Sequence, residues 1–149
     1  MLNEDYRDML RVLSGNGVRF LVVGAYAMGA HGYPRATGDI DIWVEASPEN
    51  SEKVYQSLGA FGAPLQQVNE GTFAERGIEF QIGVAPRRID IVTGISGVDF
   101  DEAYARRQIV DLEGLGVPML SHSDLIRNKR ATGREKDRLD ADRLESGPA

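Results

Sequence analysis

Residues 39–44, with the sequence DIDIWV, alternate strictly between polar and hydrophobic positions. Side chains on a strand alternate between its two faces, so this segment predicts a strand with one buried face. Asp39 and Asp41 fall on the other face. Residues 88–92, RIDIV, repeat the pattern, with Asp90 between two isoleucines. We therefore expect two strands that each present aspartate on the side opposite the isoleucines.

Helical spacing of apolar residues, together with capping signals, predicts the other elements. Helices are expected over residues 3–14, 25–32, 48–58, 99–107, 121–132 and 134–145. Further strands are expected over residues 19–23, 78–84, 108–112 and 116–119, the last two as edge strands. Residues 59–76 are expected to form a loop and residues 146–149 a loose tail. This order predicts one α/β (α+β) domain over residues 1–149, a small mixed sheet flanked by helices.

Composition narrows the possible chemistry. The chain contains no cysteine, which excludes disulfides, thiolate nucleophiles, iron–sulfur clusters and cysteine-based zinc sites. His31 and His122 are the only histidines, so a histidine-rich metal site is excluded as well. A bound metal would need oxygen ligands, which favours magnesium, manganese or calcium.

The chain shows no sign of a membrane or secreted protein. No apolar run approaches the ~18 residues that span a bilayer. The first residues, MLNEDYRDML, carry charges where a signal peptide needs apolar residues. We therefore expect a cytoplasmic protein with no membrane partner.

Charge is distributed unevenly. The net charge of −6 makes the chain a poor non-specific binder of nucleic acid. Residues 39–83 have a net charge of −6, with eight acidic and two basic residues, whereas residues 127–138 have a net charge of +4, with six basic and two acidic residues. If the fold brings these segments together, they could hold a metal ion beside an anionic ligand. The alternative for the basic segment is a solvated charged helix.

The three strand aspartates are candidate metal ligands. Asp39 and Asp41 are two residues apart, so their side chains share one face, and such a pair repels itself unless a cation neutralises it. If the strand of Asp90 is adjacent, the three carboxylates could hold one or two magnesium ions for attack on phosphorus. The alternative is that Asp39 and Asp41 line the solvated face of an edge strand.

Gly24 adds a candidate phosphate site. It follows an apolar strand and opens a short helix, where a glycine lets the main chain approach a ligand. The alternative is close packing of this alanine-rich helix on the sheet. The segment matches neither the Walker loop nor the dinucleotide-binding fingerprint.

Together these residues resemble the nucleotidyltransferase superfamily of DNA polymerase β. The pattern consists of Val23-Gly24-Ala25 after a strand, Asp39-Ile40-Asp41 on a second strand and Asp90 on a third. The segment FLVVGAYAMGAHGYPRATGDIDIWV and the ending LIRNKRATGREKDRLDADRL are similar to small bacterial and archaeal members, including toxin-type enzymes of toxin–antitoxin systems. The resemblance covers about residues 18–145 and implies the polymerase-β-like fold.

The resemblance also implies roles for individual residues. Asp39, Asp41 and Asp90 would bind Mg²⁺ or Mn²⁺ and act in catalysis, with Asp90 ligating metal or activating the acceptor hydroxyl. The expected nucleotide-binding residues are Gly24, Ala25, Arg35, Thr37, Lys129 and Asp137. Ala25 departs from the pattern, because the family usually has glycine or serine there. This loss of a hydroxyl weakens the expectation of tight nucleotide binding.

Two functional hypotheses follow. The first is a magnesium-dependent enzyme that transfers a nucleoside monophosphate from an NTP to a hydroxyl and releases pyrophosphate. The second is a weakly active or inactive member that binds a nucleotide or a partner, such as an antitoxin-like protein. A magnesium nuclease stays open, whereas the chain is short for a sugar-nucleotide glycosyltransferase. The acceptor, whether an RNA such as tRNA, a protein hydroxyl or a small molecule, is not disclosed by the sequence.

Overall fold

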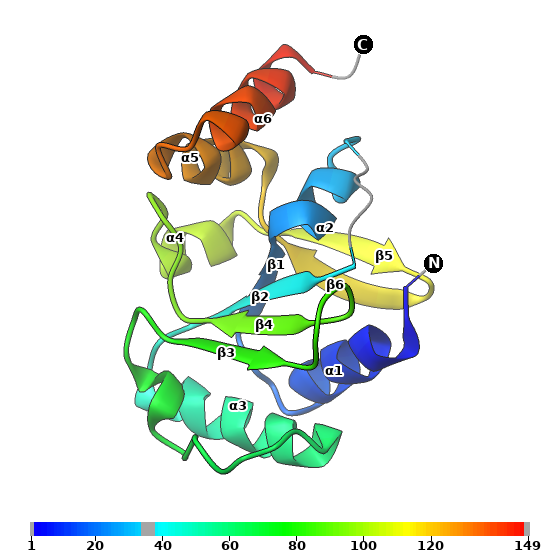
Figure 1. Cartoon of the computed structure of the whole chain (residues 1–149), viewed down its shortest axis with the longest axis vertical. Coiled ribbons are helices and arrows are strands. Elements are labelled where there is room, and N and C mark those ends of the chain that lie inside the picture. The colour runs from blue at the N-terminus through cyan, green and yellow to red at the C-terminus, as the bar shows by residue number, and fades with distance from the viewer. Residues whose placement is uncertain (1, 34–37, 148–149) are drawn as a thin grey trace.

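The structure is a computed structural model that describes residues 2–33 and 38–147. Its centre is a six-stranded mixed sheet in the order β3-β4-β2-β1-β6-β5 (Figure 1). The strands are β1 (Phe20–Val23), β2 (Ile40–Val44), β3 (Glu79–Ile82), β4 (Ile89–Val92), β5 (Gln108–Leu112) and β6 (Leu115–Met119). β2 runs antiparallel to β1 and parallel to β4, while β6 runs parallel to β1. The expected mixed sheet flanked by helices is therefore confirmed.

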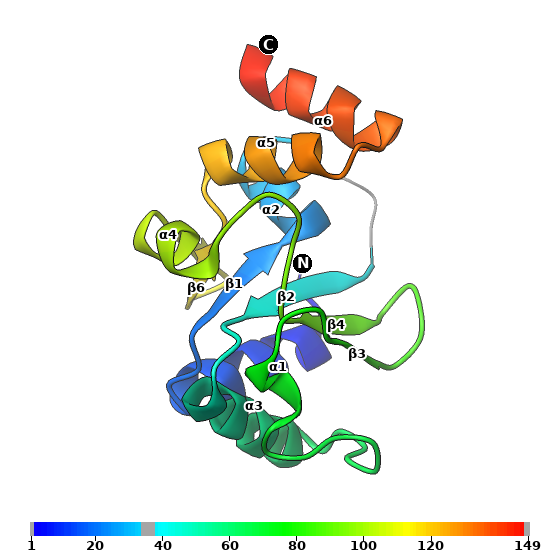
Figure 2. The same ribbon diagram turned by 90° about the vertical axis from the view of Figure 1, so that its left-hand side faces the viewer.

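Helices cover both faces of this sheet. They are α1 (Glu4–Gly15), α2 (Gly24–Ala30), α3 (Pro48–Phe61), α4 (Phe100–Ala105), α5 (His122–Ala131) and α6 (Glu135–Ser146), with a 3₁₀ turn, η1 (Thr72–Ala74). Helices α1 and α3 pack together below the sheet in Figure 2, whereas α2 and α5 lie above it, with α6 outermost on α5. Each described helix is too short or too polar to cross a lipid bilayer.

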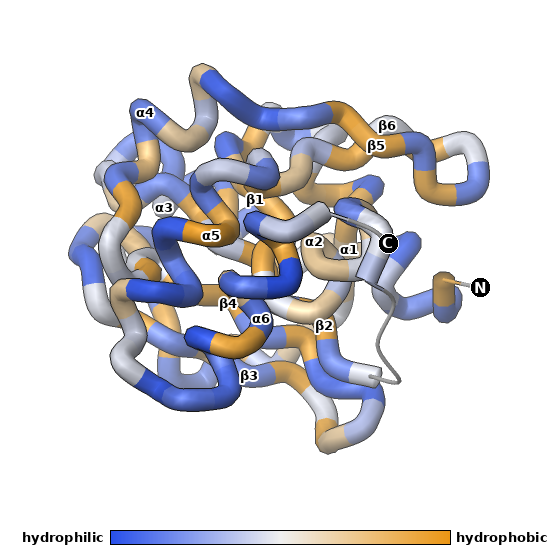
Figure 3. Tube along the Cα trace, turned by 90° about the horizontal axis from the view of Figure 1, so that it is seen from above, coloured by the Kyte–Doolittle hydropathy of each residue, from blue (hydrophilic) through white to orange (hydrophobic). Residues whose placement is uncertain are grey.

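The core follows from the alternation in the sequence. Ile40 and Ile42 of β2 and Ile91 of β4 are fully buried, and α1 adds Tyr6 and Leu10 at helical spacing. Figure 3 shows the hydrophobic stretches of the strands running through the interior and hydrophilic stretches along the outer loops. The isoleucines that flank Asp41 and Asp90 thus anchor these aspartates to the core.

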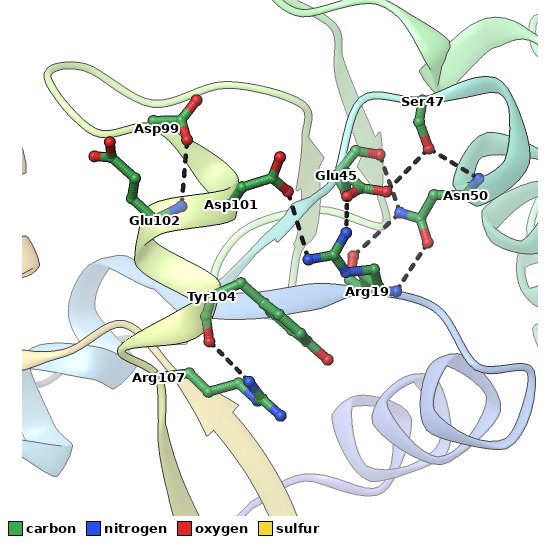
Figure 4. A network of polar contacts seen from close by, with 9 residues as sticks. All are labelled: Arg19, Glu45, Ser47, Asn50, Asp99, Asp101, Glu102, Tyr104 and Arg107. Atoms are coloured by element: carbon green, nitrogen blue, oxygen red, sulfur yellow. Dashed lines mark hydrogen bonds and ion pairs between the residues drawn. The ribbon is translucent and has the colours of Figure 1, made fainter.

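A polar network fixes the end of the sheet that lies away from Asp41. Arg19, just before β1, forms ion pairs with Glu45 after β2 and, at 3.5 Å, with Asp101 on α4 (Figure 4). Asn50 of α3 donates from Nδ2 to the carbonyl oxygens of Arg19 and Glu45, at 3.1 and 3.0 Å. Ser47 accepts the Asn50 N–H as the N-cap of α3. These contacts hold α3 and α4 at the carboxyl end of β2.

Three local expectations are corrected. Strand β6 is not an edge strand, because it pairs with β1 as well as with β5. Helix α3 continues past Leu58 to Phe61 and ends where Gly62 adopts a left-handed φ of 93°. The segment expected as a loop therefore contains the end of a helix and the η1 turn. Ser146, expected in the loose tail, is the last residue of α6.

Candidate active site

Two of the predicted aspartates face each other across neighbouring strands. In the parallel pairing of β2 with β4, Asp41 and Asp90 are direct partners. Partners in register on parallel strands point to the same face of the sheet, so the two carboxylates lie side by side. Asp90 is buried and Asp41 is half-buried. The alternative of a solvated edge strand is wrong, because β2 lies between β1 and β4.

Arg88 connects Asp90 to the third aspartate, Asp39. Its guanidinium donates to both carboxylate oxygens of Asp90, from Nε at 2.7 Å and from Nη2 at 3.1 Å. Nη2 also lies 3.4 Å from Oδ2 of Asp39, and the Arg88 backbone N–H donates to Oδ1 of Asp39 at 3.0 Å. Arg88 thus joins Asp39 to Asp90, and Asp90 is the strand partner of Asp41. These three residues, Asp39, Asp41 and Asp90, are hereafter called the aspartate cluster. Among residues 2–33 and 38–147, no three Asp, Glu or His side chains form a ready-made metal site.

The environment of Asp41 disfavours its charge. Burial, the charge of Asp90, a hydrogen bond to Asp90 and the charge of Asp39 raise the pKa of Asp41 to about 6, and Arg88 opposes this only in part. A divalent cation would offset the repulsion from Asp90 and Asp39, which adds to the effect of burial on this pKa. The donor atoms are all carboxylate oxygens, which suit Mg²⁺ or Mn²⁺. The aspartate cluster therefore fits the expected metal by its chemistry.

Gly24 brings the main chain directly against Asp41. Strand β1 ends at Val23, the register partner of Asp41, and Gly24 opens α2 with a left-handed φ of 69°. A Cβ at residue 24 would collide with Oδ2 of Asp41. The turn therefore needs glycine both for its backbone angle and for this close approach.

A cavity of about 540 Å³ opens above this turn. Its sheet side includes Gly24, Ala25 and Asp41, but neither Asp39 nor Asp90. Its other side is formed by α5, α6 and the turn between them, through Asn128, Lys129, Thr132, Arg134, Lys136, Asp137 and Asp140. The acidic strand segment and the basic helical segment thus meet across one cavity.

Lys129 lies in an ion-pair network within this cavity wall. Its Nζ lies 3.2 Å from Oδ1 of Asp137 and 3.3 Å from Oδ2 of Asp140, and both carboxylates are buried. Asp137 also accepts hydrogen bonds from Thr132 at 2.8 Å and from Arg134 at 2.7 Å. Although burial opposes it, these partners hold the pKa of Asp137 below its usual range. The pairing of Lys129 with Asp137 gives Lys129 a structural role.

Most of the predicted site residues lie in this one region. The cavity is lined by Gly24, Ala25, Asp41, Lys129 and Asp137. Asp90 and Asp39 lie beside Asp41 through strand register and Arg88. Arg35 and Thr37 fall outside the described residues.

Sequence reasoning missed two contributors. Asp140 was not singled out, although its position three residues after Asp137 places both on one face of α6. Arg88 was not singled out either, although it stands two residues before Asp90 and so shares its face. The alternation of side chains along a strand therefore indicates that Arg88 lies beside Asp90.

No family model and no curated protein matches the sequence. A Thermotoga maritima protein, TM1012, described provisionally as a nucleotidyltransferase, is similar with a TM-score of 0.63 and 16% identity, over 98% of this chain and 94% of that chain. The chain has the nucleotidyltransferase fold. The lincosamide antibiotic adenylyltransferase LnuA, bound to lincomycin, shares this fold with a TM-score of 0.56 and 14% identity, over 98% of both chains.

The nucleotidyltransferase fold covers nearly the whole chain in both comparisons. The resemblance seen in the sequence is therefore supported by the three-dimensional arrangement. At this level of identity the comparisons show the fold alone.

Proposed function

We propose that the protein is a metal-dependent nucleotidyltransferase that transfers a nucleoside monophosphate from an NTP to a hydroxyl and releases pyrophosphate. The observation that carries this proposal is the register pairing of Asp41 with Asp90 beside the Gly24 turn. Asp41 lies in the wall of a cavity that is also lined by lysine and arginine side chains. Negative ligands for a metal and positive partners for phosphate thus lie within one site.

Each part of the site has a role in this proposal. Asp39, Asp41 and Asp90 would hold Mg²⁺ or Mn²⁺, and one of them would accept the proton of the attacking hydroxyl. The main chain at Gly24 and Ala25 would approach the phosphates, and Arg134 and Lys136 would neutralise their charge. When bound, the metal would lower the pKa of the hydroxyl and take up charge on the leaving pyrophosphate.

The test is transfer of label from each α-labelled NTP with Mg²⁺ to RNA, protein or small-molecule hydroxyls. We expect transfer by the wild type and its loss in Asp41→Asn. Asp8→Asn is the matched control, because Asp8 is an exposed aspartate on α1. LnuA acts on lincosamide antibiotics, so small hydroxylated molecules belong in the first acceptor panel. No transfer to any acceptor by the wild type would contradict the proposal.

A second candidate is a member that binds nucleotides without transferring them. Ala25 favours it, because this residue lines the cavity and offers no hydroxyl to a phosphate. Calorimetry tests nucleotide binding, which the two candidates have in common. Both require NTP binding that depends on Mg²⁺ or Mn²⁺, because the aspartate cluster alone would repel a triphosphate. NTP binding with equal affinity in EDTA would count against the metal site.

A further inference from the structure

Arg88 contacts the carboxylate oxygens that a metal ion would need as ligands. Both carboxylate oxygens of Asp90 already accept hydrogen bonds from its guanidinium. We propose that Arg88 is an internal cation of the aspartate cluster, which holds Asp90 and Asp39 in the metal-free protein and competes with a divalent ion for them. This inference rests on the proposed function, because it assumes that the aspartate cluster binds metal.

The burial of Asp90 makes the competition direct. Only 5% of Asp90 is exposed, so its carboxylate has little surface left for another ligand. The geometry of two parallel N–H···O contacts is the strong, bidentate form of an arginine–carboxylate pair. A metal that takes either oxygen of Asp90 must therefore weaken or replace a contact with Arg88.

The main chain of Arg88 is fixed by hydrogen bonds, whereas its side chain is partly open to solvent. The Arg88 carbonyl accepts the Ile40 N–H at 3.0 Å and the Tyr6 hydroxyl at 3.1 Å, which fixes the backbone between β2 and α1. The Arg88 side chain is 31% exposed, so it has a path toward solvent. A rotation of this side chain alone can uncover Asp90 without disturbing the strand pairing.

Electrostatic repulsion makes Arg88 and a divalent metal ion compete for the aspartate cluster. Arg88 already neutralises part of the charge of Asp39 and Asp90, and a divalent ion close to its guanidinium would be repelled by it. Binding of either cation should lower the affinity of the cluster for the other, because such coupling is reciprocal. Arg88 thereby keeps the carboxylates ordered and partly neutralised until metal arrives.

The test is Mn²⁺ binding to the full chain without nucleotide, measured by calorimetry. In Arg88→Gln, we expect Mn²⁺ to bind about tenfold more tightly than in the wild type, the scale set by removing one unit charge near a divalent ion. The metal-free variant should melt at a lower temperature, because Asp90 loses its partner. Arg87→Gln is the matched control, because Arg87 is an exposed neighbour with no ion pair to any described residue. Its Mn²⁺ affinity should stay within about twofold of the wild type.

A second measurement needs no destabilising variant. In the wild type, titration with Mg²⁺ should shift the Arg88 Nε–H resonance in an NMR spectrum, as the contact with Asp90 opens. Arg88→Lys, which keeps the charge, identifies that resonance by its loss.

The outcomes separate the inference from the proposed function. If the wild type binds Mn²⁺ but Arg88→Gln binds it no more tightly, or if the Arg88 resonance stays unchanged at saturating Mg²⁺, the inference is overturned and the proposed function stands. If neither wild type nor variant binds Mn²⁺, both are overturned.

Discussion

Asp41 has an unfavourable charge that a bound cation would relieve. Its pKa is raised from 3.8 to about 6, chiefly by burial and by Asp90. The folded chain therefore binds this proton more tightly than the unfolded chain does. The stability that comes with the protonated carboxyl is fully present below about pH 4 and is lost as the pH rises through about 6.

We predict that Asp41→Asn stabilises the metal-free protein at pH 7.5. Asparagine has a similar shape and cannot ionise, so the variant avoids the cost of a buried carboxylate beside Asp90. The gain should be about 1–3 kcal/mol in the free energy of unfolding at pH 7.5, and should nearly disappear at pH 4. Urea unfolding in EDTA at both pH values measures this. A variant less stable than the wild type at pH 7.5 would contradict the assigned electrostatics.

At the residue scale, the sequence predicted the strand face on which a residue lies better than it predicted the ion-pair partners of that residue. Alternation placed Asp39 and Asp41 on one face and gave Asp90 the same pattern. Arg88 acquires its role only through contacts across the fold, to Asp39 from a residue 49 positions away. Local patterns give the side of a strand on which a residue lies, whereas ion pairs depend on which strands become neighbours.

At the element scale, α5 and α6 form a charged wall over the sheet. The two helices pack together, and Lys129 of α5 pairs with Asp137 and Asp140 of α6. The resemblance seen in the sequence implied a nucleotide-binding role for Lys129. Because the side chain of Lys129 is only 14% exposed and lies between two buried carboxylates, the structure favours the structural role. Lys136, which is exposed and has no ion pair with a described residue, is better suited to meet a phosphate.

This division of roles predicts opposite effects for two lysines. Lys129→Ala should lower the free energy of unfolding by about 2–4 kcal/mol, because it leaves two buried carboxylates without their shared cation. Lys136→Ala should leave the melting temperature nearly unchanged and weaken NTP binding by about 1.5–3 kcal/mol, as expected for a lost contact to a charged group. Thermal melts and calorimetry with Mg²⁺ and NTP compare them. A stable Lys129→Ala variant that fails to bind NTP would restore the phosphate role of Lys129.

A buried carboxylate also fastens α4 to α5. Asp124 is fully buried, and its backbone N–H donates to the N-cap Ser121 at the start of α5. Its carboxylate accepts a bidentate contact from Arg106 at 2.9 and 3.0 Å. Arg127 adds a contact at 3.1 Å. Asp124 thus joins the helix that forms one wall of the cavity to the segment that follows α4.

We predict that Arg106→Ala lowers the free energy of unfolding, because the fully buried carboxylate of Asp124 loses its bidentate partner. Arg107→Ala is the matched control, since Arg107 is the next residue, its guanidinium contacts the carbonyl and the ring of Tyr104 within the same turn, and it forms no ion pair with a described residue. Its effect should be within about 1 kcal/mol. Chemical denaturation measures both, and equal losses would show that Asp124 does not depend on Arg106.

The elements themselves were predictable where the pattern was long or capped. Asn3, Ser47, Asp99 and Ser121 each accept an N-terminal hydrogen bond of their helix. The position of β6 was not predictable, because an alternating segment does not show how many neighbours it will have. Pairing of β6 with β1 depends on a contact between Val22 and Met119, far apart in the sequence.

At the scale of the whole molecule, the charge asymmetry of the sequence becomes a two-sided cavity. Asp41 and Glu79 belong to the acidic segment, and Lys129, Arg134 and Lys136 belong to the basic one. The sequence predicted that the two segments could meet. That they do so across one cavity follows from the topology, which places α5 and α6 above β1 and β2 (Figure 2).

The parallel contact between β1 and β6 also affects the order of assembly. The connection from β1 to β2 is 16 residues long, from Gly24 to Asp39, whereas the partners Val22 and Met119 of β1 and β6 are 97 positions apart. Distant pairings close slowly, and a chain emerging from the ribosome folds its first segments before its last. The strands that carry the aspartates should therefore form first, and the cation-bearing helices should dock last. A nascent chain would then form the strands of the aspartate cluster before the cation-bearing helices complete the site. It would therefore bind a triphosphate only near the end of its synthesis.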